Sequence, residues 1–394
     1  MRDFTFYAPT EVVFGRGAET QAGKLLKKYG ATRVLIHYGS GSAVRSGLLG
    51  RLIRVIEEEG LHHVELGGVH ANPRLSKVYE GIDLARREKI DFILAVGGGS
   101  VIDSAKSIAY GVKMEGDVWD LFAGKAEATD ACPFGCVLTI AASGSETGGG
   151  CVLTKEEGGL KWDYVSPYGF SRFSILNPEL TETLPPYQTA CGCTDILMHT
   201  LERFFHSGST LRLTDRIAVA LMRTVMEAAG TLQQDPHCYE ARAEVMWAGS
   251  LSHNGLTGCG GGMGSWVPHK LQCELGGRYD IAHGAGLAAI WPSWARFVSE
   301  TEPERFAVLG ETLLGLEPSE DRKKLAEDAI CTMEEFFRSI GMPTRIPELG
   351  VDLSEAEIRE LSRQVTKEDT VRLGDLRPVG QNEAEEIFRR ACGA

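Results

Sequence analysis

The stretch CGCTDILMHTLERFF, residues 191–205, carries an acid and an imidazole one helical turn apart. Asp195 and His199 are four positions apart, so both project from one face of the helix that this pattern predicts. Apolar residues surround them, and a carboxylate or imidazole buried among such residues needs a polar partner or a metal ion. A hydrogen bond between the two side chains and a shared metal ion both satisfy that need.

Two further histidines follow in VPHKLQCELGGRYDIAHGAGLA, residues 267–288. His269 and His283 lie in apolar or glycine-rich surroundings, and Gly284 leaves space beside the second ring. One aspartate and three histidines form a ligand set that suits Fe²⁺ or Zn²⁺. Spacing alone does not bring four distant residues together, but the combined set favours a metal site over an isolated hydrogen bond.

Three short loops of small residues each follow a predicted strand: YGSGSAV, GGGS and TIAASGSETGGG. Glycines let a ligand approach the backbone, and N–H groups at the start of a following helix bind phosphate. A tight turn explains each loop alone equally well, and Ile102 stands where the third glycine of a G-x-G-x-x-G motif would be. Together, three such loops at the carboxyl ends of parallel strands indicate a nucleotide site. We also expect Ser100 to cap the helix after GGGS, with the capping-box spacing to Asp103.

The elements that must position these residues fall into two regions. Short β-rich runs alternate with helical patterns in the first half of the chain, which predicts a mostly parallel, Rossmann-like sheet covered by helices. A Pro-Pro pair near residue 184 introduces a series of helical patterns. We predict an α/β dinucleotide-binding domain over 1–183 and an all-helical metal-binding domain over 184–394. The predicted strands are 33–38, 62–69, 91–98, 134–140 and 172–178.

Composition excludes several classes of protein. The 394-residue chain has a net charge of −13, so it lacks the basic excess that nucleic-acid binding requires. No uncharged apolar stretch approaches the roughly 18 residues of a membrane span. The ten cysteines lack the spacings of a disulfide scaffold or zinc ribbon, and the first residues do not resemble a secretory signal. We therefore expect a cytoplasmic protein with neither nucleic acid nor membrane as its partner.

The order of these motifs resembles the iron-containing (group III) alcohol dehydrogenase family. GGGSVIDSAKSIA, TIAASGSE, DILMHTLERFF and the final HGAG occur in that order, and the start YAPTEVVFGRGAE and tail GDLRPVGQNEAEEIFRRA resemble the family's ends. NPELTETLPPYQTACGCTDILMHTLERFF is most similar to the butanol-dehydrogenase branch. The resemblance covers essentially the whole chain.

The resemblance implies hydride transfer between a nicotinamide cofactor and a primary alcohol or aldehyde, in a protein that commonly forms a homodimer. A divalent cation at the substrate oxygen favours loss of the alcohol proton, and the cofactor carries the hydride. The implied metal ligands are Asp195, His199, His269 and His283. The residues expected at the cofactor are Gly39, Ser40, Gly41, Ser42, Arg45, Gly97, Gly98, Gly99, Ser100, Asp103, Thr139, Ser143, Ser145 and Lys161.

One position departs from the family. Cys273 stands where the family has a second histidine, four residues after His269, which is thought to help move the alcohol proton. A thiol of ordinary pKa is a poor substitute at neutral pH. The residues alone leave four hypotheses open for Cys273. It only fills space, it relays protons through water, it approaches the metal as a further ligand, or it reflects an unusual substrate. It is nevertheless the candidate catalytic residue.

Two questions of function remain. The alternatives to an alcohol dehydrogenase are a glycerol-dehydrogenase-like polyol oxidoreductase, a dehydroquinate-synthase-like lyase and a catalytically impaired metal- or nucleotide-binding relative.

The cofactor is predicted to be NADP(H) rather than NAD(H), because no acid occurs between Gly39 and Arg45 to repel a 2′-phosphate. Arg45 would add positive charge there, although a solvated surface arginine explains it equally well.

Overall fold

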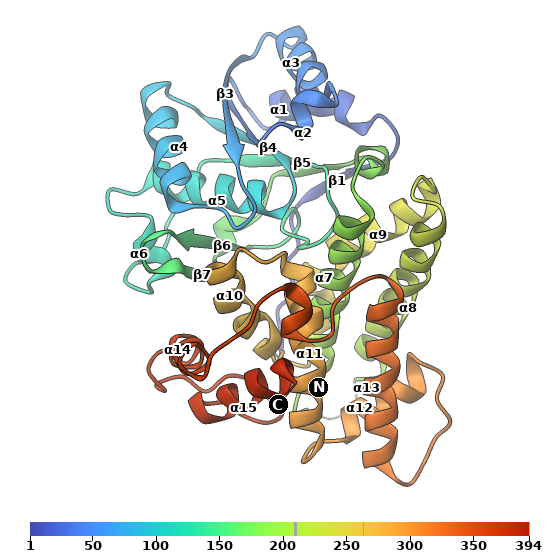
Figure 1. Ribbon diagram of the computed structural model, residues 1–394. Coiled ribbons are helices and arrows are strands. Elements are labelled where there is room, and N and C mark those ends of the chain that lie inside the picture. Colours follow the sequence, from blue (N-terminus) through green and yellow to red (C-terminus); the bar gives the residue numbers. More distant parts are fainter. Residues whose placement is uncertain (209–210, 263, 394) are drawn as a thin grey trace. The chain divides into compact units, whose positions relative to one another are not determined.

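The computed structural model describes residues 1–208, 211–262 and 264–393. The chain forms two compact units, an α/β unit of Tyr7–Leu184 and a helical unit of Met1–Phe6 with Pro185–Ala394 (Figure 1). Arg2 ties the first residues to the helical unit. Its backbone N–H donates to the Gly260 carbonyl at 2.8 Å, and its guanidinium donates to Ser207 Oγ at 2.8 Å.

The α/β unit contains a six-stranded sheet in the order β1-β8-β5-β4-β2-β3, in which every neighbouring pair is parallel. The predicted parallel sheet is therefore confirmed, and all five predicted strands occur in it. The edge strand β1 was not predicted, because its four residues are too few to show a pattern. The strands are β1 Glu11–Phe14, β2 Arg33–Gly39, β3 His62–Val69, β4 Phe92–Gly97, β5 Phe134–Leu138 and β8 Phe173–Leu176.

Side chains alternate between the two faces of this sheet. Val34 and Ile36 of β2 join a core with helices on one side, whereas His37 points to the other side and meets Ser104 of α5. Helices α1 and α3 cover the first face, and α4 and α5 cover the second (Figure 1). The helices of this unit are α1 Ala22–Lys28, α2 Ser42–Arg45, α3 Leu48–Glu58, α4 Leu75–Arg87, α5 Gly99–Lys113 and α6 Trp119–Phe122.

The segment after the third small-residue loop forms an antiparallel hairpin that the sequence patterns did not predict. Strands β6 Gly150–Lys155 and β7 Leu160–Val165 pair outside the main sheet, and β6 packs on α5. The predicted capping box at Ser100 is wrong. Helix α5 begins earlier, with Gly98 as its N-cap and no side-chain cap. The Asp103 carboxylate instead accepts hydrogen bonds from Ser145 Oγ at 2.6 Å and the Val152 N–H at 3.0 Å.

The second unit is helical, as predicted. Helix α11 lies at its centre, and Gly284–Ala295 of this helix are all buried, which is typical of a helix enclosed by others. Among the described residues, no helix combines the length and the apolar character that crossing a bilayer requires. The helices are α7 Pro186–Phe204, α8 Arg212–Gln234, α9 Tyr239–His253, α10 Val267–Tyr279, α11 His283–Ser299, α12 Glu304–Thr312, α13 Arg322–Ser339, α14 Glu355–Val365 and α15 Gln381–Cys392.

Candidate active site

Helix α7 supplies the first two groups of the site. It begins at Pro186, a residue that fits the first turn of a helix because its missing N–H has no intrahelical acceptor there. Asp195 and His199 project from one buried face, and Glu202 follows on the same face. The spacing of four and then three residues places all three side chains on one side of the helix.

Helices α10 and α11 supply the two other predicted ligands. His269 is in the first turn of α10, and His283 is the first residue of α11. Gly284 allows α11 to start directly against α7, since a Cβ at this glycine would lie 2.1 Å from the Cys191 carbonyl oxygen. The absence of a side chain at Gly284 therefore brings His283 to the α7 residues.

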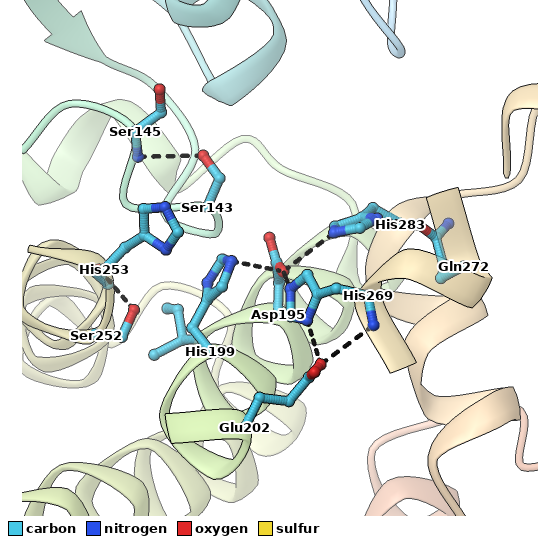
Figure 2. A network of polar contacts seen from close by, with 12 residues as sticks. Ser143, Ser145, Asp195, His199, Glu202, Ser252, His253, His269, Gln272 and His283 are labelled. Carbon is cyan, nitrogen blue, oxygen red and sulfur yellow. Dashed lines mark hydrogen bonds and ion pairs between the residues drawn. The ribbon is translucent and has the colours of Figure 1, made fainter. Parts of the chain in front are cut away.

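The structure brings the four predicted ligands together around one oxygen atom. Oδ1 of Asp195 lies 3.8 Å from Nε2 of His199, and 3.6 Å from Nε2 of both His269 and His283. Figure 2 shows Asp195 between the three rings. Asp195, His199 and His269 are buried, whereas the His283 side chain is 29% exposed. The cluster is therefore more open to solvent beside His283 than beside the other three side chains.

Several of these polar atoms lack the partner that burial requires. Among the described residues, Asp195 Oδ1 and His269 Nε2, which face each other, are buried without a hydrogen bond. Such atoms are costly unless something satisfies them. Carboxylate oxygen and imidazole nitrogen are ligands of Fe²⁺ and Zn²⁺, so this donor set fits a divalent cation.

The electrostatics of the cluster favour a neutral ring at His199 and a charged ring at His269. Burial lowers the pKa of His199 well below its usual range, and the neighbouring His253 and His269 lower it further. Burial also acts to lower the pKa of His269, but the carboxylates of Glu202 and Asp195 outweigh it and raise this pKa to about 9. A site that stabilises a charged imidazole between two carboxylates also stabilises a metal cation there.

Two outer side chains hold the rings, and the sequence analysis missed both. Glu202 contacts Nδ1 of His269, and Gln272 contacts Nδ1 of His283 (Figure 2). The spacing offered a signal, because Glu202 is three residues after His199 and Gln272 is three after His269. His253, at the end of α9, lies beside His199 with ring centroids 4.3 Å apart.

In the α/β unit, the three small-residue loops follow β2, β4 and β5, which are neighbours in the sheet. Two of the loops pack directly on each other. A Cβ at Gly98 would lie 2.0 Å from Ile140 Cγ2, and one at Gly99 would lie 2.3 Å from Ser143 Oγ. The N–H of Thr139 also donates to the Gly97 carbonyl at 3.1 Å. The predicted loops thus share one edge of the sheet.

Two buried side chains of α5 shape the third loop. Lys106 donates at 2.7 Å to the carbonyl oxygens of Ser145, Gly148 and Gly150. Asp103 binds Ser145 and Val152, so it acts on the loop conformation. Burial of Asp103 raises the pKa of its carboxyl group. The positive charge of Lys161, which is buried on β7, acts in the opposite direction and lowers this pKa.

The first loop is the most exposed. Ser40, Ser42 and Arg45 are exposed, while Gly39 and Gly41 are partly buried. Gly41 has φ +141°, and a Cβ there would lie 2.9 Å from Arg45 Nη1. The guanidinium of Arg45 therefore folds back over the loop. Ser100 lies inside α5.

Cys273 is on α10, one turn after His269, and is partly buried. It takes no part in a disulfide bond.

Both halves of the chain match one family. The model described as "Iron-containing alcohol dehydrogenase" matches residues 9–178, and the one described as "Fe-containing alcohol dehydrogenase family, C-terminal" matches residues 189–392. The crystal structure of NADH-dependent butanol dehydrogenase A from Thermotoga maritima superposes with a TM-score of 0.95 at 35% identity, covering 99% of each chain.

Curated relatives differ in the cofactor that their names state. The chain is 40% identical over 359 residues to the probable NADH-dependent butanol dehydrogenase 2 of Bacillus subtilis, covering 91% of this chain and 92% of that protein. It is 31% identical over 394 residues to the NADPH-dependent aldehyde reductase YqhD of Escherichia coli, covering 99% and 100%.

Proposed function

Because the chain belongs to the iron-containing alcohol dehydrogenase family and is thus a metal-dependent, NAD(P)-dependent oxidoreductase of alcohols and aldehydes, we propose that Asp195, His199, His269 and His283 hold its metal ion. The observation that carries this proposal is the convergence of three imidazole Nε2 atoms on Asp195 Oδ1, at 3.6 to 3.8 Å. The ion is Fe²⁺ or Zn²⁺, both of which accept this donor set.

The side chains divide the work of the reaction. Asp195 would give the ligand set one negative charge and the imidazoles would bind the cation in their neutral form, so the centre would keep a net positive charge toward the substrate oxygen. When bound, the cation polarises that oxygen and the nicotinamide exchanges the hydride. The exposed side of His283 is where substrate approaches the cluster. Cys273, one turn from His269, is the candidate group for handling the alcohol proton.

The substrate class follows from the relatives. Butanol dehydrogenases and an aldehyde reductase are among them, which supports short primary alcohols and aldehydes as substrates. A polyol is the alternative, since two dehydrogenases of the diol 1,3-propanediol match at 28% and 29% identity.

We propose NADP(H) as the preferred cofactor, held by the three loops of the α/β unit. The relatives include both NADH- and NADPH-dependent enzymes, so family membership alone does not decide between the two. The residues of the first loop support the phosphorylated form. Ser40 and Ser42 are exposed hydroxyl donors, Arg45 folds over Gly41, and no carboxylate lies among residues 39–45.

We further propose a cytoplasmic homodimer. Exposed aromatic side chains near the start of the chain support association, since Phe4, Phe6 and Tyr7 are 53%, 46% and 58% exposed. Ten cysteine thiols support a reducing compartment. Sedimentation of the purified protein tests the dimer, and a single monomeric species would contradict it.

Turnover and metal content test the function together. Protein loaded with Fe²⁺ or Zn²⁺ is expected to oxidise NADPH with short aldehydes, measured by nicotinamide absorbance. Asp195→Ala and His283→Ala are expected to lose both metal and turnover. Full metal stoichiometry at high affinity in both variants would refute the ligand set. Metal binding without turnover on any aldehyde, alcohol or polyol would instead identify a catalytically impaired relative.

A further inference from the structure

The rings of His269 and His283 are each held at the nitrogen that does not face Asp195. Oε1 of Glu202 contacts Nδ1 of His269 and also accepts its backbone N–H at 3.2 Å. Oε1 of Gln272 contacts Nδ1 of His283. Each ring is thus held at Nδ1 and turned so that Nε2 faces Asp195.

The amide of Gln272 must accept the hydrogen bond for His283 to serve as a ligand. A neutral imidazole carries one N–H, and a ligand nitrogen must present its lone pair to the metal. Because Nε2 of His283 faces Asp195, the proton of the ring must lie on Nδ1. Of the two polar atoms of the Gln272 amide, the carbonyl oxygen is the one that can accept it. The reversed amide would select the tautomer whose Nε2–H points into the ligand cluster.

Packing alone does not account for an amide at position 272. The Gln272 side chain is fully buried, and its Nε2 has no hydrogen-bond partner among the described residues. A buried, unsatisfied amide N–H costs free energy that an apolar side chain would avoid. Two glycines make the room for it, because a Cβ at Gly276 would lie 2.7 Å from Gln272 Nε2, and one at Gly286 would lie 2.8 Å from Gln272 Cγ.

We propose that Gln272 is a positioning residue that fixes the tautomer and orientation of His283, as Glu202 does for His269. The inference rests on the ligand set proposed above. The arrangement joins three helices in sequence, since Glu202 of α7 holds a ring of α10, and Gln272 of α10 holds a ring of α11.

Two substitutions separate the acceptor from the packing. Gln272→Met keeps an unbranched side chain of similar size and removes the acceptor. Gln272→Glu keeps the acceptor. Gln364→Leu on α14, whose amide donates to Glu360 at 3.0 Å, is a matched control away from the cluster. Metal-free full-length protein is titrated with Zn²⁺ against a chelator of known affinity, and Co²⁺ absorption reports the geometry.

We expect Gln272→Met to bind Zn²⁺ about 10- to 100-fold more weakly, with an altered Co²⁺ spectrum. The melting temperature of its metal-free form should change little, because the loss of the hydrogen bond to His283 is offset by the removal of an unsatisfied amide N–H. Gln272→Glu and Gln364→Leu should bind at least as tightly as wild type. Wild-type affinity in Gln272→Met, or an equal loss in Gln272→Glu, would overturn the inference. If wild-type protein itself binds no metal, the proposed function fails instead.

Discussion

The ammonium group of Lys106 lies 2.7 Å from the carbonyl oxygen of Ser145 and makes equally short contacts with the carbonyls of Gly148 and Gly150. One fully buried cation on α5 therefore fixes three backbone groups of a single loop. The same helix holds that loop through Asp103, which accepts from Ser145 Oγ and the Val152 N–H. The loop conformation thus depends on two charged groups that lie beneath it.

Removing the cation should therefore be costly. We expect Lys106→Met to lower the free energy of unfolding by about 3 kcal/mol, because three carbonyls lose their buried donor and the buried Asp103 loses a nearby positive charge. Urea unfolding measures the change. Lys113→Met is the control on the same helix, since that side chain is 45% exposed and should change stability by less than about 0.5 kcal/mol. Equal effects of the two substitutions would contradict the role of Lys106.

The contrast between Asp103 and Asp195 shows which contacts sequence patterns can predict and which they cannot. Spacing placed Asp195 and His199 on one helical face, because a helix of 3.6 residues per turn fixes that relation locally. Spacing also suggested that Asp103 completes a capping box, yet its carboxylate binds residues more than 40 positions away. Contacts of that kind depend on how the loop and hairpin return to α5. The pairing of Gln272 with His283 across two helices was hidden for the same reason.

His37 gives the α/β unit a pH-dependent stability. The ring is fully buried between the Leu66 carbonyl and Ser104 Oγ, each at 2.9 Å. Burial lowers its pKa to about 4 from the usual value of 6.5. Its contribution is therefore fully present above pH 6.5, where both folded and unfolded chains are neutral, and is lost as the pH falls toward 4, where only the unfolded chain takes up the proton.

We expect this loss to reach about 3 kcal/mol between pH 6.5 and 4, from a shift of about 2.5 pH units. The measurement compares the unfolding free energies of wild type and His37→Leu across this range, so that other titrating groups cancel. The difference between the two proteins should shrink by that amount as the pH falls. A difference that stays constant with pH would show that His37 titrates normally.

The role of the Cys273 thiol in proton transfer can be tested by kinetics. Cys273 follows His269 by one turn of α10, so an imidazole there would share the face of the candidate ligand. If native turnover is low, Cys273→His should raise kcat for aldehyde reduction by about tenfold or more, because imidazole transfers protons well near neutral pH. Cys331→His, at an exposed site on α13, should leave kcat unchanged. Equal or lower kcat in Cys273→His across an aldehyde panel would show that the thiol suits its own substrate.

Cofactor choice should depend on charge in the loop that follows β2. Ser40 is exposed, and the register of the sheet pairs the preceding Gly39 with Val69 of β3, so position 40 lies just beyond the end of both strands. A carboxylate there would repel a 2′-phosphate and accept a hydrogen bond from a 2′-hydroxyl. We expect wild type to prefer NADPH, and Ser40→Asp to shift the ratio of kcat/KM for NADPH over NADH by about tenfold or more toward NADH. Ser339→Asp, which adds the same charge at an exposed position on α13, should leave the ratio unchanged. A clear NADH preference in the wild-type enzyme would refute the assignment of the loop, and an unshifted ratio in Ser40→Asp would mean that the 2′ position lies elsewhere.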